Sequence, residues 1–440
     1  MTPRRGPRPL PLHLSLAGMR RVAALAALPL LGPAGMCQGN NKGSNSSNKR
    51  SNKGSPPSSP GSPSWNPAWP RSSAGRQEMA RIAAALAAGG HRAEAFQEAV
   101  LRVLARQDAA LIGGIAAYRR QAPPEGPPPP PAIWTEGGSA LRDYGGHGGA
   151  GGPALLVVPS LVNRARVLDL LPDSSCLRFL AASGARPLLL EWGEPGALER
   201  GFTLTDYIAG RLERALAAAV AATGGKVVLV GYCMGGLLAL AAAQRCPDRV
   251  AALALWAVPW DFWAGGAAEA RALAATLPAL EPLLELSGAL PVEALQALFA
   301  LPDPFGVAAK YRGFARLDPE GPAARRFGAL EDWLNDGVPL VAPVARECLA
   351  GWYGANSPAR GVWRVAGEAV SPARLGLPAF LAVPSRDRIV PPASALALAR
   401  LLPGAALHRA AAGHVGMVAG RGAEAALWRP FLAWLRQLHP

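Results

Sequence analysis

The chain has 440 residues, half of them hydrophobic, so it can bury a large core in one or two domains. Its formal net charge of +15 is concentrated at one end: residues 1–76 hold eight arginines, three lysines and no acid (+11), which leaves +4 for the rest. Because this excess lies in a tail, it argues against nucleic-acid binding. The five cysteines show no CxxC pair and no metal-type spacing, so we expect free thiols in a reducing compartment and no metal site.

The first 75 residues are predicted to be a basic, disordered extension. Residues 38–73 are almost entirely Gly, Asn, Ser, Lys and Pro, which cannot bury enough apolar surface to offset the entropy of ordering. The arginines before the apolar run 22–31 resemble a secretory signal, but Pro29 interrupts the run and Met36 is too large for the residue before a lipoprotein cysteine. We therefore favour a cytoplasmic location. No run reaches the roughly 18 apolar residues that a transmembrane helix needs.

The next two segments are expected to be a helical region and a linker. Within 76–121, apolar residues recur at three- and four-residue steps on both sides of Gly89-Gly90, which predicts two helices. These apolar faces need a partner, either the main domain or a second subunit. The segment 122–152 combines a run of five prolines with a glycine-rich stretch and is predicted to be a semi-rigid linker.

From residue 153 the chain alternates short apolar runs with amphipathic segments, which predicts a mostly parallel sheet with helices on both faces. We expect this α/β core to comprise 153–262 and 377–440, with 263–376 inserted between two strands as a helical cap. The expected strands are Leu155–Val158, Pro187–Leu190, Val227–Val230, Ala251–Ala257, Ala379–Val383 and a weaker one near Ala405–Leu407.

The segment Gly231-Tyr232-Cys233-Met234-Gly235-Gly236 follows a buried strand and precedes an apolar helix. This is the sequence of an α/β-hydrolase nucleophile elbow with cysteine in place of serine. Glycines on both sides let neighbouring backbone pass close by. The N-terminus of the following helix favours the thiolate of Cys233, and the backbone N–H of Met234 is predicted to be one oxyanion donor.

In this fold the acid and the base follow the nucleophile along the chain. His414 lies in a loop after the last expected strand and is predicted to be the general base. Asp387, just after the strand Ala379–Val383, is the preferred acid, and Asp261, after the preceding strand, is the alternative.

The loop after the first strong strand, residues 159–163, is expected to supply a second oxyanion donor, for which we select Leu161. Arg164 and Arg166 follow on the same loop. They are candidates for contact with a phosphate-bearing leaving group, although an ordinary solvated role fits them as well.

These blocks together resemble the polyhydroxyalkanoate synthase family. The likeness rests on five motifs: Pro159–Asn163 with Leu168-Asp169-Leu170, Glu191-Trp192-Gly193-Glu194-Pro195, Asp206-Tyr207, the cysteine box around Cys233, and Asp387–Pro391 with Gly413-His414. The resemblance implies (R)-3-hydroxyacyl-CoA substrates, a growing polyester product, a cap over the site and association with polymer granules. It also implies a homodimer or a small partner subunit. Coenzyme A enters only as part of the substrate, and no other cofactor is expected.

A cysteine suits such an acyl transfer because its acyl-enzyme is itself a thioester, so the bond energy of the coenzyme A ester is retained until a hydroxyl attacks. The alternative function is hydrolysis, as a thioesterase or polyester depolymerase. A non-catalytic granule-binding subunit that kept the fold is a further alternative, against which the complete Cys–Asp–His set argues.

Overall fold

A computed structural model describes residue 4 and residues 6–28, 72–145 and 152–438. Cys37 and nearly all of the stretch 38–73 therefore lie outside the described residues. The chain divides into two compact units: residues 1–10, 117–307 and 317–440 form the first, and residues 11–116 and 308–316 form the second. Within the described residues, no helix combines the length and the apolar character needed to cross a bilayer.

The first unit is built around an eight-stranded sheet of order β1-β2-β6-β3-β7-β8-β13-β14. The hairpin β1–β2 pairs antiparallel, β2 is antiparallel to β6, and the remaining neighbours are parallel. The strands are β1 (Ala132–Glu136), β2 (Ser139–Asp143), β3 (Ala154–Val158), β6 (Arg186–Glu191), β7 (Val227–Tyr232), β8 (Val250–Trp256), β13 (Ala379–Pro384) and β14 (Ala406–Ala410). All six strands expected from the apolar runs are present, and the expected α/β fold is confirmed.

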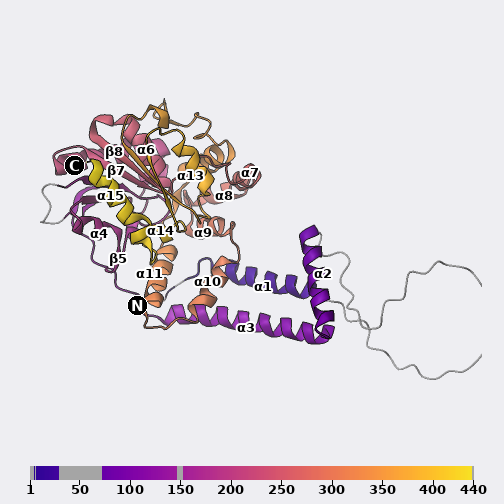
Figure 1. Cartoon of the computed structure of the whole chain (residues 1–440). Helices are drawn as coiled ribbons and strands as arrows, with labels where there is room; N and C mark the ends of the chain where they lie inside the picture. The colour runs from indigo at the N-terminus through magenta and orange to yellow at the C-terminus, as the bar shows by residue number, and fades with distance from the viewer. Residues whose placement is uncertain (1–3, 5, 29–71, 146–151, 439–440) are drawn as a thin grey trace, which may run out of the picture. The chain divides into compact units, whose positions relative to one another are not determined.

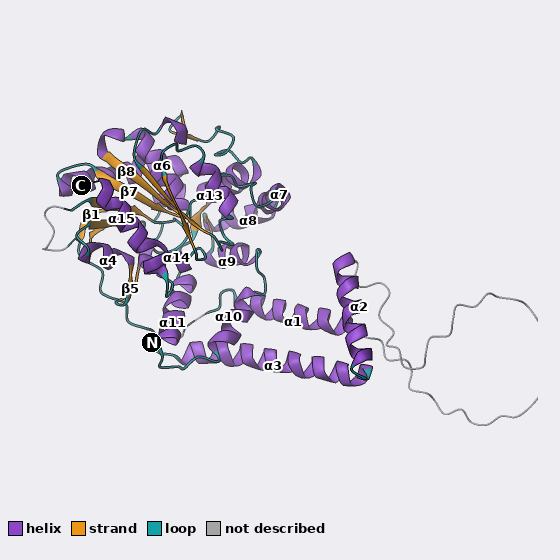
Figure 2. Ribbon diagram, viewed as in Figure 1, coloured by secondary structure: helices purple, strands orange, loops and turns teal. Residues whose placement is uncertain are grey.

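Helices cover both faces of this sheet, as Figure 2 shows. Successive strand residues point to opposite faces, so Leu156 and Val158 of β3 pack into one core cluster and Leu155 and Val157 into the other. The first cluster is closed by η4 (Asp206–Leu212), α5 (Glu213–Thr223), α6 (Met234–Arg245) and α13 (Pro392–Ala399). The second is closed by α4 (Cys176–Ala182), α14 (Gly416–Ala419), η8 (Glu424–Trp428) and α15 (Arg429–Leu438).

The segment 122–152 is not merely a linker, because it contributes the hairpin β1–β2 to one edge of the sheet. Polar and exposed residues alternate with few buried ones in these strands, which obscured them in the sequence. Leu141 is fully buried, and β2 pairs with β6 over four residues. The prediction of a linker therefore fails between residues 132 and 143.

The insertion between β8 and β13 is mainly helical, but it does not belong to one unit. It contains α7 (Ala267–Ala274), α8 (Leu277–Ser287), β9 (Ala289–Leu290), α9 (Val292–Ala300), α10 (Gly306–Phe314), α11 (Pro322–Asn335), β10 (Leu340–Val341), α12 (Ala342–Arg346), η6 (Glu347–Gly354), β11 (Arg364–Val365), β12 (Glu368–Ala369) and η7 (Pro372–Arg374). Residues 308–316 of α10 and the turn after it group with the second unit, so the expected cap 263–376 is divided. Shorter elements of the core are η2 (Ala165–Leu168), β4 (Asp169–Leu171), β5 (Ser174–Ser175), η3 (Glu199–Gly201) and η5 (Pro247–Arg249).

The second unit consists of helices α1 (Leu10–Ala26), α2 (Ser73–Ala88), most of α3 (Ala93–Arg120) and most of α10. Gly114 lets α3 approach α10, since a side chain there would overlap the carbonyl oxygen of Tyr311. Arg21 of α1 pairs with Asp108 of α3 at 3.1 Å. The prediction of a disordered extension over 1–75 is therefore wrong for residues 10–26, which form a helix. Contacts with residues far along the chain stabilise this helix, and composition alone does not indicate them.

Candidate active site

Cys233 lies between β7 and α6, at a corner near the middle of the strand order. Figure 1 labels both elements. The backbone of Cys233 has φ 56° and ψ −130°, a conformation that non-glycine residues adopt only when the surrounding structure imposes it. Its N–H donates to the carbonyl oxygen of Trp256 in β8 at 2.9 Å. The neighbouring strand thus holds the corner, which presents the sulfur beyond the carboxyl end of the sheet.

The glycines around Cys233 are required by close backbone contacts. A Cβ on Gly231 would overlap the backbone of Gly236, and a Cβ on Gly235 would overlap the carbonyl oxygens of Val158 and Pro159. Helix α6 therefore begins directly against the end of β3. This close approach is the physical reason for the glycine pattern from which the elbow was predicted.

His414 and Asp387 meet across 27 residues of sequence. His414 Nδ1 and Asp387 Oδ2 are 2.7 Å apart, and both residues are buried. The other carboxylate oxygen, Asp387 Oδ1, accepts the backbone N–H groups of Ile389 and Val390 at 2.8 and 2.9 Å. These bonds fix the carboxylate, which in turn orients the imidazole so that its other nitrogen is available.

The charge state of His414 follows from its surroundings. Burial lowers the pKa of His414, but the negative charges of Cys233 and Asp387 and its hydrogen bonds to both outweigh burial and raise this pKa to about 10. The His414 imidazole is therefore charged at neutral pH, in the same cavity as Cys233. That combination provides both a nucleophile and a proton donor for a leaving group.

Cys233 and His414 line one cavity of about 80 Å³. Its walls include the loop after β3, with Ser160, Val162 and Asn163, and side chains of the insertion, namely Gln296, Phe299, Trp333 and Leu334. Side chains of the insertion therefore line the same cavity as Cys233. A cavity of this size is well below the roughly 300–1,000 Å³ of ordinary ligand pockets.

Asp261, the alternative acid, has another role. Its Oδ1 accepts the backbone N–H of Trp263 at 2.9 Å and the side-chain amide of Asn356 at 2.8 Å. Asn356 in turn accepts the backbone N–H of Phe262 at 3.0 Å. The carboxylate thus secures the start of the insertion, while Asp387 is the acid that the structure places against His414.

Neither of the two expected oxyanion donors, Met234 and Leu161, is among the residues that line the cavity. Met234 is the first residue of α6, next to Cys233, as an oxyanion donor requires. Leu161 is buried and is not among the residues lining the cavity, and the N–H of its neighbour Val162 is taken by Ser160 Oγ at 3.2 Å. Leu161 as the second oxyanion donor stays a prediction.

The two arginines of the loop differ in their surroundings. Arg164 pairs with Glu194 and, at 2.9 Å, with Asp336, so its charge is already compensated by two carboxylates. Arg166 is exposed. A phosphate-binding role therefore fits Arg164 poorly.

The other described cysteines are not reactive by environment. Cys176 and Cys348 are buried, and burial raises the pKa of both thiols far above neutrality. Burial, helped by nearby Glu213, also raises the pKa of Cys246. These three residues remain protonated at neutral pH, as expected of packing or surface cysteines.

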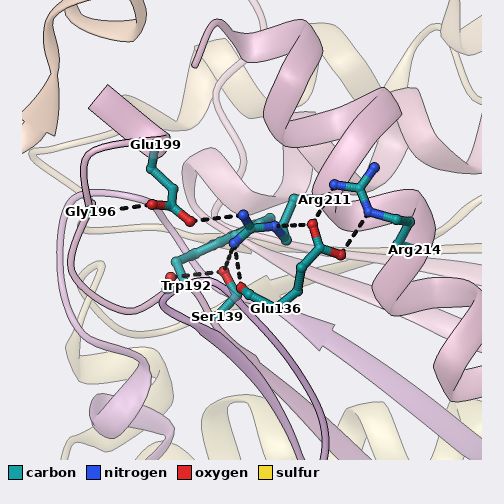
Figure 3. Close-up of polar contacts among 7 residues, drawn as sticks. All are labelled: Glu136, Ser139, Trp192, Gly196, Glu199, Arg211 and Arg214. Atoms are coloured by element: carbon teal, nitrogen blue, oxygen red, sulfur yellow. Dashed lines mark hydrogen bonds and ion pairs between the residues drawn. The ribbon is translucent and has the colours of Figure 1, made fainter. Parts of the chain in front are cut away.

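A buried ionic network beside the site was not foreseen from the sequence. Arg211 of η4 is fully buried and donates to Glu136, Glu199 and Ser139, while the Ser139 hydroxyl donates to the carbonyl oxygen of Trp192 at 2.9 Å (Figure 3). The Trp192 indole N–H donates to the carbonyl oxygen of Pro159 at 3.0 Å.

This network connects the edge hairpin to the loop after β3 that lines the cavity. From the sequence alone, Arg211 would be expected on the surface, because it lies beside the apolar stripe of a helix. Only the position of the hairpin over η4 makes it a buried one.

A family model described as alpha/beta hydrolase fold matches residues 147–419, more than half of the chain. The chain therefore belongs to the alpha/beta hydrolase fold family. Its strand order and its strand–elbow–helix corner agree with this assignment.

Curated relatives narrow the assignment. The chain is 28% identical over 287 residues to the poly(3-hydroxyalkanoate) polymerase subunit PhaC of Haloferax mediterranei. The aligned region covers 64% of this chain and 58% of that protein. It is 26% identical to the corresponding subunit of Synechocystis sp. (64% and 77% covered) and 27% identical to that of Allochromatium vinosum (64% and 80% covered). The resemblance to the polyhydroxyalkanoate synthase family is confirmed, although the match spans less than two thirds of the Haloferax protein.

Proposed function

We propose that this protein is a polyhydroxyalkanoate synthase-like acyltransferase that moves (R)-3-hydroxyacyl groups from coenzyme A through a Cys233 thioester to a growing polyester. One observation carries the proposal: the Cys233 sulfur stands on a strained corner in the same cavity as His414, which is hydrogen-bonded to a buried Asp387. The curated relatives are polymerase subunits, and this supports the substrate class.

In the first half of the cycle, the Cys233 thiolate attacks the thioester carbonyl carbon. The carbonyl oxygen becomes an oxyanion, for which the Met234 N–H at the start of α6 is the donor we propose. When the intermediate collapses, the carbon–sulfur bond to coenzyme A breaks and the His414 imidazolium gives its proton to the departing thiolate. The acyl group is then held on Cys233 as a thioester.

In the second half, the 3-hydroxyl of an incoming hydroxyacyl unit attacks that thioester. Neutral His414 takes the hydroxyl proton, an ester bond forms, and the Cys233 thiolate is released beside a renewed imidazolium. Asp387 orients the ring in both halves and stabilises its charged form. Exchange of one thioester for another is nearly isoenergetic, whereas conversion of a thioester to an ester is downhill, so a sulfur nucleophile keeps the driving force for chain transfer.

Exclusion of water decides between transfer and hydrolysis. The side chains of Phe299, Trp333 and Leu334 place apolar surface of the insertion over the cavity that holds Cys233. A hydroxyl that arrives with bound substrate then meets the acyl-enzyme in preference to solvent. We further propose that the protein acts in the cytoplasm at the surface of polyester granules, as a homodimer or with a small partner subunit.

The test is the product formed from (R)-3-hydroxybutyryl-CoA by purified protein. We expect release of coenzyme A together with insoluble polyester, and Cys233→Ala should abolish both. Cys246→Ala, a half-buried cysteine at the far end of the same helix, is the matched control and should behave as the wild type. Release of free 3-hydroxybutyrate without polymer would instead identify a hydrolase.

A further inference from the structure

Two arginines near the start of the chain contact helices that line the Cys233 cavity. The described part of this segment, residue 4 and residues 6–8, belongs to the same compact unit as Cys233, although it lies far from it in the sequence. Helix α9 contributes Phe299 to the cavity wall, and α11 contributes Trp333 and Leu334. The N-terminal segment therefore binds the elements that shape the site.

Arg4 binds α11 through Asp332. Its guanidinium pairs with the Asp332 carboxylate and donates to the backbone carbonyl oxygens of Tyr118 and Gln121 at 3.0 and 2.9 Å. The Tyr118 hydroxyl donates to the other carboxylate oxygen of Asp332 at 2.7 Å. Only 6% of the Arg4 side chain is exposed, so solvent screens this ion pair little. Gly328, one turn earlier on α11, leaves space for these contacts, because a Cβ there would crowd the Gln121 side chain and the Arg4 guanidinium.

Arg8 joins α11 to α9. Its guanidinium donates to the backbone carbonyl oxygen of Asn335, the last residue of α11, at 2.6 Å, and pairs with Glu293 in the first turn of α9. A cation at this end of a helix satisfies a carbonyl that has no partner within the helix and interacts favourably with the helix dipole. The backbone N–H of Arg8 donates to Asn335 Oδ1 at 3.0 Å. The two helices also meet directly, since the Gln296 amide of α9 donates to the carbonyl oxygen of Leu334 at 2.8 Å.

The arginine contacts and the cavity wall occupy neighbouring positions of α11. Asp332 and Asn335 bind the arginines, whereas Trp333 and Leu334, between them, line the cavity. The Trp333 indole N–H donates to the backbone carbonyl oxygen of Arg164 at 2.7 Å, in the loop after β3 that also lines the cavity. Because a helix shifts as a rigid element, a displacement at the arginine contacts also displaces this wall.

We infer that Arg4 and Arg8 are positioning residues that set the width of the cavity at Cys233. Arg4 fixes α11, and Arg8 fixes the separation of α11 and α9, so the loss of either lets the walls part. Neither arginine lines the cavity, and both therefore act through the two helices. The inference goes beyond the proposed function, because it concerns which molecules reach the sulfur, whatever acyl group the sulfur carries.

The test measures how strongly the cavity selects reagents by size. Iodoacetamide and its bulkier N-phenyl analogue, iodoacetanilide, have the same reactive carbon: the Cys233 sulfur bonds to that carbon and iodide leaves. We measure both rate constants by mass spectrometry on the peptide that contains Cys233, so the other cysteines do not contribute. The variants are Arg4→Met and Arg8→Met. Arg21→Met is the matched control, because it removes an arginine whose partner, Asp108, lies in the second unit.

In the wild type we expect iodoacetamide to react much faster than iodoacetanilide. The ratio of the two rate constants should fall about tenfold in Arg4→Met and Arg8→Met, equivalent to about 1.4 kcal/mol of selectivity, and stay within about twofold of the wild type in Arg21→Met. Arg8→Lys keeps a cation at the end of α11, and its ratio should lie between those of Arg8→Met and the wild type.

Urea unfolding of each variant shows whether it is folded under the assay conditions, and Arg4→Met and Arg8→Met are independent, so a folding defect in one leaves the other informative. An unchanged ratio in the folded variants, an equal fall in Arg21→Met, or a wild-type ratio near one would overturn the inference. Failure of the proposed function is detected separately, as a lack of polymer from the hydroxyacyl thioester, and does not alter the alkylation test.

Discussion

Replacement of Arg211 by methionine is a severe test of how the edge hairpin supports the site. Arg211 makes four hydrogen bonds: to Glu136 Oε1 at 3.0 Å, to the Glu136 carbonyl oxygen at 2.7 Å, and to Ser139 Oγ and Glu199 Oε1 at 2.8 Å. Methionine matches much of the aliphatic volume but removes the charge. Arg214→Met, in a half-exposed side chain that also binds Glu136, is the matched control.

The size of the effect depends on which carboxylate is left alone. Glu136 keeps Arg214 as a partner and is partly exposed, so solvent screens the effect of losing its ion pair with Arg211. Glu199 is only 4% exposed and loses its guanidinium partner, keeping the Gly196 N–H at 3.0 Å. Removing one partner of a buried ion pair costs about 3–5 kcal/mol, and an exposed pair contributes below about 1 kcal/mol. We therefore expect Arg211→Met to lower the free energy of unfolding by about 3–5 kcal/mol, and Arg214→Met to lower it by less than about 1 kcal/mol.

The assay is urea-induced unfolding of wild type and both variants at pH 7, repeated toward acid pH. Burial raises the pKa of Glu199, but the hydrogen bond and charge of Arg211 outweigh burial and lower it in the folded protein. A lowered pKa stabilises the fold above the unfolded value of 4.5, and this contribution is lost as the pH falls through the folded pKa. The difference in the free energy of unfolding between wild type and Arg211→Met should therefore become smaller toward pH 3. A deficit at pH 7 equal to that of Arg214→Met would refute the reasoning.

Three further outcomes follow from the site. Asp387→Asn should lower turnover by about 10³–10⁴-fold, whereas Asp261→Asn should leave it within about threefold; equal losses in steady-state coenzyme A release would contradict the choice of acid. In NMR titrations, His414 should stay protonated through pH 8 and lose its proton near pH 10, and Cys233→Ala should lower that pKa because one of the two charges opposing burial is gone. Since folding raises the pKa of His414 above 6.5, its contribution to the stability of the fold is complete below pH 6.5 and is lost as the pH rises through about 10. A wild-type His414 that titrates near 6.5 would contradict the ion pair with Asp387. Gly235→Ala should abolish both the alkylation of Cys233 by iodoacetamide and its acylation by the substrate, because the added methyl group would displace α6 from the end of β3; normal labelling of Cys233 would show that the corner tolerates it.

The elbow could be predicted from the sequence because its determinants are contiguous. A buried strand, a cysteine between glycines and an apolar helix specify the local backbone, and the overlaps at Gly231 and Gly235 show why other residues fail there. The long, apolar parallel strands were predicted for the same reason. The edge hairpin was missed because its short strands mix polar and apolar residues without a continuous apolar run, and they are held by pairing with β6 and by the bonds of Arg211.

The sequence by itself determined the fold class and the strand-to-helix corner that carries Cys233, since both depend on residues that are neighbours along the chain. The tertiary structure decided that Asp387 rather than Asp261 meets His414, that Arg164 is already paired, and that Cys233 and His414 line one small cavity. Those outcomes depend on how distant segments pack against one another, because the strength of an ion pair or the volume of a cavity is set by distances that no local pattern encodes.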